Sequence, residues 1–155
     1  MRTRVLAVAA ITLLACGGEK DIDTSALVGE WEGTKTFLDQ NGETVGSAPG
    51  WRFQIVQDGL MFLRFVNGPK VVLASPTEFT ISKFDYPPQA MNAPGGNCSP
   101  TEQSITGGTG TLEADGVLHV DLFWDHTCGG VTTHRRATFT MTRVGTAGTV
   151  GGSLL

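Results

Sequence analysis

The chain has no apolar run long enough to cross a bilayer as a helix. The segment from Val5 to Ala15 has eleven residues and is interrupted by Thr12, whereas a spanning helix needs roughly 20. Charge is also scarce, at 17% of 155 residues, and Asp and Glu outnumber Lys and Arg by 15 to 11. This balance leaves no basic patch suited to nucleic acid, so we expect no nucleic-acid partner. The length is that of one domain, well short of the about 250 residues of an α/β barrel.

Motifs for catalysis are missing as well. No serine lies in a Gly-x-Ser-x-Gly elbow, and no Cys-x-x-Cys pair offers a metal site. Asp121 and Asp125 lie near the three histidines, a combination that could bind a metal or transfer protons. Strand alternation, however, places both aspartates and His119 on the solvent side, with His134 on the outer face of the next strand. We therefore expect no enzyme, no catalytic residue, no metal and no cofactor.

Glycine and threonine are abundant, with 21 and 20 residues, and this mix indicates β-structure because threonine favours strands and glycine favours turns. From Leu27 onward, period-two segments are separated by turn signals such as Asp58-Gly59, Asn67-Gly68-Pro69 and Asp115-Gly116. The predicted strands are Glu30–Leu38, Trp51–Gln57, Leu60–Val66, Lys70–Ala74, Thr77–Lys83, Gln103–Glu113, Val117–Asp125 and Val131–Val144.

Eight strands with mostly short connections predict an all-β fold, a single antiparallel up-and-down β-barrel over residues 27–144. The one long connection, from Phe84 to Glu102, contains four prolines and Gly95-Gly96. We expect it to be irregular and to act as a lid or capping loop. Residues 145–155 are Gly-rich without a core pattern and are predicted to be a flexible tail.

The pairing of the last two strands can be predicted from their side chains. A four-residue loop at 127–130 would place Val120 opposite Ala137, with both facing the interior. The same register puts Asp121 beside Arg136 on the outside, as a pair of unlike charges.

The preceding turn makes a similar prediction. A three-residue turn at 114–116 would set Leu112 against Leu118 and leave Gly108 and Gly110 facing inward. Small inward residues would make room in the barrel and hollow its interior.

The start of the chain resembles the leader of bacterial lipoproteins. Met1-Arg2-Thr3-Arg4 is cationic, the apolar run follows, and Leu13-Leu14-Ala15-Cys16 resembles the lipobox. In that family the leader is cut before the cysteine, which then carries acyl chains that anchor the protein in a membrane. The alternative is a secreted protein cleaved near Ala15.

The resemblance implies a signal peptide at 1–15, a lipid anchor at Cys16, and a polar tether at 16–26. Gly17 after the cysteine, rather than Asp, resembles lipoproteins that are sent on to an outer membrane. We therefore expect a lipid-anchored protein of the cell envelope, at the outer membrane.

Two further cysteines remain once Cys16 carries lipid. Cys98 and Cys128 would form a matched pair in an oxidising compartment, so we expect a disulfide between them. By the loop-entropy model it would contribute roughly 3–4 kcal/mol. A zinc site is the competing interpretation, but two isolated cysteines lack the usual ligand spacing.

Gly29-Glu30-Trp31 resembles the Gly-x-Trp signature of lipocalins and related calycin barrels. In that family the tryptophan plugs the closed end of the barrel, and an arginine on a late strand packs across it. Arg143 is on the inward face of the last predicted strand, and antiparallel pairing would return it beside Trp31. The resemblance covers 27–144 and implies a lipocalin-like barrel that holds a small ligand.

If Trp31 closes one end of the barrel, four basic residues lie near the other end, at inward or rim positions. They are Lys35, Arg64, Lys83 and Arg135. Such a mouth would favour an anionic head group above an apolar interior. We therefore predict non-catalytic binding of a small hydrophobic or amphipathic ligand, including an anionic amphiphile such as a fatty acid. Snorkelling of long side chains at strand ends is the simpler explanation of the cations. The predicted ligand-binding residues are Lys35, Arg64, Lys83, Arg135, Trp51, Phe53, Phe62 and Trp124.

The third predicted strand is apolar on both faces. If Phe62 faces the interior, Met61, Leu63 and Phe65 form an outward stripe that needs a cover. The Pro-rich connection, the membrane or a protein partner could cover it. The alternative function is therefore an envelope structural or interaction module, such as an inhibitor or assembly partner, with a filled barrel and no ligand.

Overall fold

The computed structural model describes residues 23–58, 63–87, 89–93 and 96–145. Several predictions concern residues outside this part of the chain. They are those on the leader, Cys16, most of the tether, the turn glycine Gly59, Met61, Phe62, the side chain of Cys98, and the tail after Gly145.

Every regular element in the described part is a strand, and no helix there has the length and hydrophobicity needed to cross a membrane. The strands are β1 (Gly29–Leu38), β2 (Thr44–Gln57), β3 (Leu63–Phe65), β4 (Lys70–Leu73), β5 (Glu78–Ile81), β6 (Phe84–Asp85), β7 (Gln89–Ala93), β8 (Gly96–Leu112), β9 (Leu118–Cys128) and β10 (Val131–Gly145).

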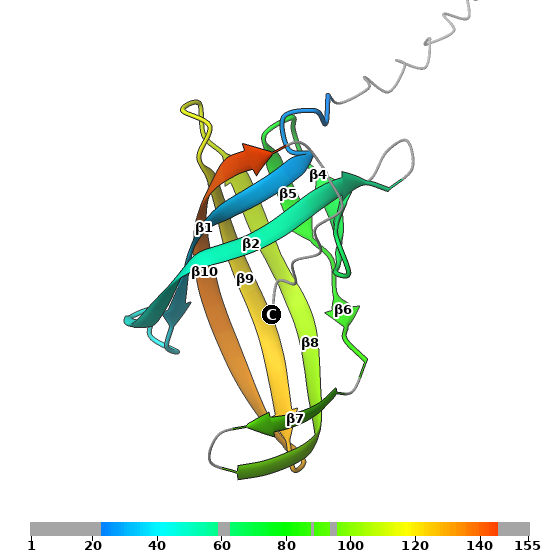
Figure 1. The fold of residues 1–155 in the computed structure, drawn as a ribbon, viewed down its shortest axis with the longest axis vertical. Coiled ribbons are helices and arrows are strands. Elements are labelled where there is room, and N and C mark those ends of the chain that lie inside the picture. Colours follow the sequence, from blue (N-terminus) through cyan, green and yellow to red (C-terminus); the bar gives the residue numbers. More distant parts are fainter. Residues whose placement is uncertain (1–22, 59–62, 88, 94–95, 146–155) are drawn as a thin grey trace, which may run out of the picture.

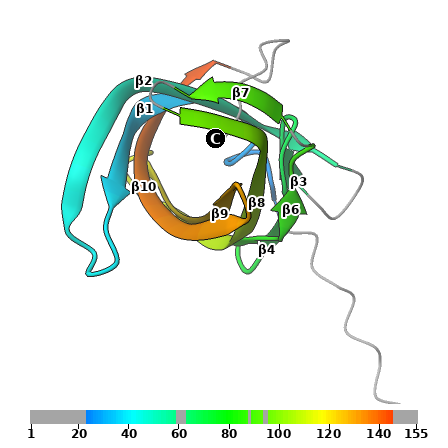
Figure 2. The ribbon, with the colours of Figure 1, turned by 90° about the horizontal axis from the view of Figure 1, so that it is seen from below.

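Eight of the strands pair into a closed ring. Around the ring they follow the order β1, β2, β3, β4, β5, β8, β9 and β10, and β10 pairs with β1 again. All of these pairs are antiparallel. Figure 2 shows the strands arranged around the interior. The prediction of an antiparallel up-and-down β-barrel of about eight strands is confirmed.

Alternation explains how β9 and β10 form the interior. Successive side chains of a strand point to opposite faces, and here the apolar set of each strand points inward. Their buried residues are Leu118, Val120, Leu122 and Trp124 on β9, and Ala137, Phe139 and Met141 on β10.

The turn between β9 and β10 is shorter than predicted. Cys128 pairs with Val131, which leaves a two-residue loop of Gly129 and Gly130. Both glycines have positive φ, at 56° and 80°, and a type I′ hairpin turn needs positive φ at its two central positions. Residues with side chains adopt that conformation rarely, so Gly-Gly stabilises the tight turn.

This turn shifts the predicted register by two residues. Ala137 lies opposite Leu122, and the predicted pairing with Val120 is wrong. A shift of two keeps every side chain on its face, so the inward positions are as predicted. The ion pair between Asp121 and Arg136 also forms, because the two side chains meet diagonally. Arg136 donates to both carboxylate oxygens of Asp121, at 2.9 and 2.6 Å.

A row of aromatic rings fills the middle of the barrel. Phe139 packs edge-on against Trp51 and Phe53, with centroid distances of 6.3 and 6.0 Å. Phe65 packs in the same way against Phe53 and Phe79, at 5.1 and 6.4 Å. Burial of several large rings is a major source of stability in a domain of this size.

The inward glycines of β8 receive large side chains. Gly110 pairs with Phe79, and a Cβ added at Gly110 would lie 2.0 Å from that ring. Gly108 pairs with Ile81, whose Cδ1 would lie 3.0 Å from an added Cβ. The predicted pairing of Leu112 with Leu118 is confirmed. The expectation that these glycines hollow the interior is wrong, because the facing side chains occupy the space.

The connection from Phe84 to Glu102 is more regular than predicted. It contains β6, β7 and the first residues of β8, and β7 pairs with β8 in a hairpin that sets Ala93 opposite Gly96. Pro87 follows β6 and lies outside any strand, where no ladder hydrogen bond is lost. The irregular conformation expected here is therefore wrong for its described residues, and the expected role as a lid or capping loop stays a prediction.

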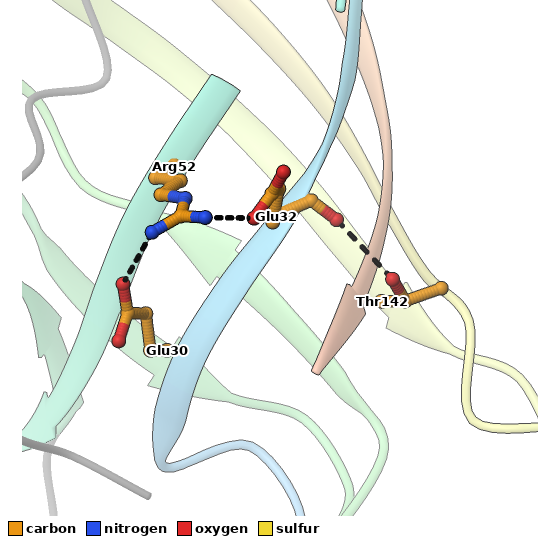
Figure 3. Close-up of polar contacts among 4 residues, drawn as sticks. All are labelled: Glu30, Glu32, Arg52 and Thr142. Carbon is orange, nitrogen blue, oxygen red and sulfur yellow. Dashed lines mark hydrogen bonds and ion pairs between the residues drawn. The ribbon is translucent and has the colours of Figure 1, made fainter. Parts of the chain in front are cut away.

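Polar contacts on the outer face join three neighbouring strands (Figure 3). The guanidinium of Arg52 on β2 lies 3.8 Å from the carboxylate of Glu30 and 2.5 Å from that of Glu32, both on β1. Thr142 on β10 donates a hydrogen bond of 3.4 Å to the carbonyl of Glu32. Exposed pairs of this kind contribute about 0–1 kcal/mol each, so they add modestly to the barrel's stability.

Candidate functional site

Lys35 on β1 points into the barrel, near the end opposite Trp31. Only 3% of its surface is exposed. It lies opposite Phe139 of β10 and Ala48 of β2, and the alternation that buries Trp31 turns it inward. Its predicted inward orientation is confirmed.

Four aromatic rings surround the Lys35 ammonium. Its Nζ lies 4.3 Å from the ring centroid of Trp51 and 4.7 Å from that of Trp124. The centroids of Phe37 and Phe139 are 4.9 and 5.4 Å away. A cation near the faces of such rings is attracted by their electrons, and the attraction is strongest where water is excluded. We call these four residues the aromatic cage.

Burial changes the acid–base behaviour of Lys35. Loss of hydration disfavours the charged amine and lowers its pKa from 10.5 to about 8. The ring faces act in the opposite direction, since they attract the ammonium but not the neutral amine. A large fraction of this lysine is therefore neutral at mildly alkaline pH.

A cleft of about 520 Å³ opens beside the cage. Its lining residues come from β1, the turn after β1, β2, β9 and β10, and Figure 1 shows the β1–β2 hairpin diverging from β9 and β10. Phe37 and Trp124 belong to both the cage and the cleft wall, so the Lys35 ammonium lies just behind that wall. The lining residues are Phe37, Leu38, Asp39, Gln40, Val45, Phe123, Trp124, Thr133, His134, Arg135 and Arg136.

The divergence of the strands has a local cause. Pairing of β1 with β10 ends at Leu38 and Arg136, while β10 continues to pair with β9 alone. Directly after β1, the Asp39 carboxylate accepts hydrogen bonds from the backbone amides of Asn41 and Glu43, at 2.9 and 2.8 Å. These bonds form a tight turn that leads the chain into β2 and away from β10.

Of the four basic residues predicted at the mouth of the barrel, Arg135 lines the cleft. Lys35 lies behind the cleft wall. Arg135 lies on the inner face of β10, opposite Trp124, and its side chain is exposed. The neighbouring Arg136 binds Asp121 on the outer face. Arg135 therefore supplies positive charge at the entrance, and Lys35 supplies it at the base.

Arg64 lies outside the site. It is exposed between Leu63 and Phe65, which are buried among the core residues. The expected inward orientation of Arg64 is therefore wrong, and so is an outward stripe that includes Leu63 and Phe65. The predicted strand Leu60–Val66 has apolar residues on both faces, so alternation could not decide which face turns inward.

Lys83 also lies away from the cleft. β5 ends at Ile81, two residues earlier than predicted, and the exposed Lys83 ammonium is 3.5 Å from the carboxylate of Asp85. Of the predicted aromatic residues, Trp51 and Trp124 belong to the cage, and Phe53 is buried in the row of rings.

The opposite end of the barrel is closed by Trp31. Arg143 lies opposite it, with the guanidinium carbon 5.2 Å from the ring centroid. Arg143 donates to the backbone carbonyls of Ser25 and Ala26, and the Trp31 indole donates to the carbonyl of Leu27 at 3.0 Å. The predicted meeting of Trp31 and Arg143 is confirmed.

The β1–β2 hairpin is the part of the site that the sequence prediction missed. Phe37 lies two residues after Lys35 and therefore on the same face, which was the available signal.

Among the described residues, no group of three or more His, Cys, Asp and Glu side chains is placed to hold a metal ion. Comparison of the chain with protein-family models, curated proteins and solved structures gives no match.

Proposed function

We propose that the protein binds a small amphipathic ligand, without catalysis, in the cleft beside the aromatic cage. One observation carries the proposal: an apolar wall of Phe37 and Trp124 separates the cleft from a buried ammonium, and Arg135 stands at the same opening. The volume of the cleft, about 520 Å³, lies in the range typical of small-molecule sites.

The arrangement favours a ligand with an apolar chain and an anionic head. Leu38 and Val45 extend the apolar wall, while Arg135 offers a planar set of donors that suits a carboxylate or phosphate. A negative charge near Lys35 would favour its protonated form and raise its pKa toward the ordinary value. Ligand binding and protonation of Lys35 are therefore expected to be coupled.

Displacement of a fluorescent fatty acid tests this proposal. Arg135→Ala should weaken the Kd by about tenfold, the effect of losing one charge-assisted hydrogen bond, and Lys35→Met should weaken it less, because the Lys35 ammonium lies behind the apolar wall and acts only through its charge. Arg64→Ala is the matched control, because it removes the same charge from the outer face. No binding by the wild-type protein, or equal weakening by all three substitutions, would contradict the proposal.

An interaction module is the second candidate. Val45 and Phe123, two apolar residues that line the cleft, are exposed by 66% and 41%. Apolar side chains gathered on one surface are a common feature of protein contacts. Native mass spectrometry of the protein from its own host distinguishes the two functions: a retained small molecule favours ligand binding, and a retained protein favours the interaction module.

Export and lipidation complete the proposed function. We propose that the leader at 1–15 is removed and that Cys16 anchors the protein in the outer membrane of a cell envelope. The eight residues from Cys16 to Asp23 span seven intervals and reach at most about 25 Å, and the segment after them is bound at the Trp31 end. The cleft would then face away from the anchoring membrane. Cys16→Ser should move the protein from the membrane fraction to the soluble fraction.

We also propose a disulfide between Cys98 and Cys128. β8 pairs with β9, and Thr101 lies opposite Cys128, so the backbone brings both cysteines to the same end of the sheet. Mass mapping of peptides under non-reducing conditions should find the two cysteines linked. Free thiols at both positions in protein from its own host would contradict this pairing.

A further inference from the structure

The cleft lies along the edge of β10 rather than over one of its faces. The four consecutive residues 133–136 all line it, although their side chains point alternately to the inner and the outer face of the sheet. On its other side the cleft is lined by residues 37–40, where β1 ends and the chain turns away. The free space therefore lies in the plane of the sheet, where a strand beside β10 would continue.

The backbone of β10 has no strand partner beside the cleft. Pairing with β1 stops at Arg136, and within the part of the chain that the structure describes, residues 131–135 pair with β9 alone. All five of these residues are exposed, and in Figure 1 this part of β10 forms the edge of the sheet below the β1–β2 hairpin. An edge of five residues is about 17 Å long, which is the usual length of a strand.

The direction of the edge groups follows from the hairpin turn. Cys128 and Val131 flank the two-residue turn and so form a hydrogen-bonded pair, and such pairs alternate along an antiparallel ladder. The backbone amides and carbonyls of Thr132 and His134 therefore point away from β9, toward the open side. They are the groups to which an added strand would bind.

A second unpaired edge, on β2, is protected against added strands. Residues 44–53 pair with β1 alone among the described residues, but Pro49 lacks an amide and the pairing shifts register twice. Proline and bulges are common means of blocking an edge. Residues 131–135 contain neither proline nor glycine, and their pairing with β9 has no shift. Of these two edges, the one on β10 is therefore suited to accept a strand.

Arg135 determines the kind of strand that fits. Its neighbours have acidic partners on the outer face, because Arg136 binds Asp121 and the His134 ring lies 2.6 Å from the Asp125 carboxylate. Arg135 is on the inner face and makes no ion pair with a described residue. Unlike charges directly opposite each other stabilise two neighbouring strands. An added strand with a carboxylate opposite Arg135 would supply the missing partner.

We propose that the cleft takes an extended peptide segment of another protein, which adds to β10 as an antiparallel strand and carries an acidic side chain opposite Arg135. The peptide backbone binds the edge groups of Thr132 and His134, and its side chains alternate between the inner and outer faces. Asp39, the acidic residue of the cleft lining, already accepts hydrogen bonds within its own turn. The inference rests on the cleft of the proposed function and names the partner of the interaction module.

Fluorescence anisotropy with a labelled peptide tests the inference. The probe is acetylated Glu-Thr-Val-Thr-Val with a C-terminal dye, which places glutamate opposite Arg135 when the strand is antiparallel. The full chain, purified from its host, is titrated into the probe. His134→Pro removes the central edge amide, and proline is tolerated on an edge where no ladder bond is lost. This substitution should weaken the Kd by at least about tenfold.

His134→Val is the matched control, because it removes the same imidazole and keeps the amide. Its Kd for the peptide should stay close to that of the wild-type protein. Equal weakening by the two substitutions would overturn the inference, since the side chain and not the backbone edge would then bind the peptide.

Reversal of charge tests the inference without a proline. The wild-type protein should prefer the glutamate peptide to the same peptide with lysine in place of glutamate. Arg135→Glu should prefer the lysine peptide, because the unlike charges are then exchanged between the strands. A preference that stays the same in this variant would contradict strand addition opposite Arg135.

Addition of decanoate separates this inference from the proposed function. Excess decanoate should release the peptide, because both ligands use Arg135, and a peptide that stays bound beside decanoate would contradict the inference. If decanoate binds and the glutamate peptide does not, strand addition is wrong and the proposed small ligand stands. If the peptide binds with the expected pattern and decanoate does not bind, strand addition is supported and the small ligand is wrong.

Discussion

The two ends of the barrel each hold a cation against aromatic rings, but the partners of the two cations differ. At the closed end, Arg143 covers Trp31 and donates to the carbonyls of Ser25 and Ala26. At the cleft end, Lys35 lies within the aromatic cage, and burial lowers its pKa to about 8.

This difference separates a structural cation from a responsive one. A guanidinium keeps its charge at every ordinary pH and offers several donors in one plane, so it can link the ring to two carbonyls. An ammonium among rings loses much of its hydration, and its charge becomes sensitive to pH and to nearby anions. The arginine at the closed end therefore holds the segment of Ser25 and Ala26 against the barrel. The cleft end is the better place for a ligand.

The largest expected effect is at the closed end. Trp31→Ala should lower the free energy of unfolding by about 3–5 kcal/mol, because it removes a fully buried ring and its hydrogen bond to Leu27. Trp124→Ala removes an equal ring beside the open cleft and should cost less, because water can enter the space. Urea unfolding of both variants checks this, and equal losses would contradict the distinction between the ends.

The next effect concerns Lys35 and pH. Below about pH 8 the lysine is protonated in both the folded and the unfolded chain, so its burial penalty is present in full. Between about 8 and 10.5 the unfolded chain binds the proton that the folded chain has lost, so the stability of the wild-type protein should rise. The rise should be up to about 3 kcal/mol. Lys35→Met should lack it and be more stable near neutral pH, and parallel pH profiles of the two proteins in urea unfolding would count against this.

Arg143→Met should have a smaller effect of about 1–3 kcal/mol. It removes hydrogen bonds to two carbonyls and a contact with the Trp31 ring. Arg143→Lys keeps the charge but lacks the planar set of donors, so it should recover only part of the loss. Fatty-acid affinity, measured by displacement in the same variants, should stay unchanged because the cleft lies at the other end.

The smallest effect is expected on the outer face of the barrel. Asp121→Asn breaks the exposed ion pair with Arg136 and should cost at most about 1 kcal/mol in urea unfolding. Added salt should reduce the difference between variant and wild type, since exposed pairs are screened. A loss as large as that of Arg143→Met would mean that the outer face contributes more than its exposure implies.

Local pattern was sufficient to predict much of this molecule. Alternation on β9 and β10 separated inward from outward residues correctly, because each strand has one apolar and one polar face. Pattern was insufficient on β3. Leu63 and Phe65 are buried there, whereas Arg64 was predicted to face the interior. The predicted strand, Leu60–Val66, has apolar residues on both faces, so only packing against the rings of neighbouring strands selects the inward face.

The sequence by itself determined an all-β barrel, the inward positions of Trp31, Lys35 and Arg143, and the contact between the two residues of the closed end. Period-two burial and antiparallel pairing are sufficient for these features. Only the tertiary structure decided which rings surround Lys35 and where the cleft opens. Both depend on contacts between β1, β2, β9 and β10, and on the point where the β1–β2 hairpin leaves the sheet, and such long-range contacts have no signature in local sequence.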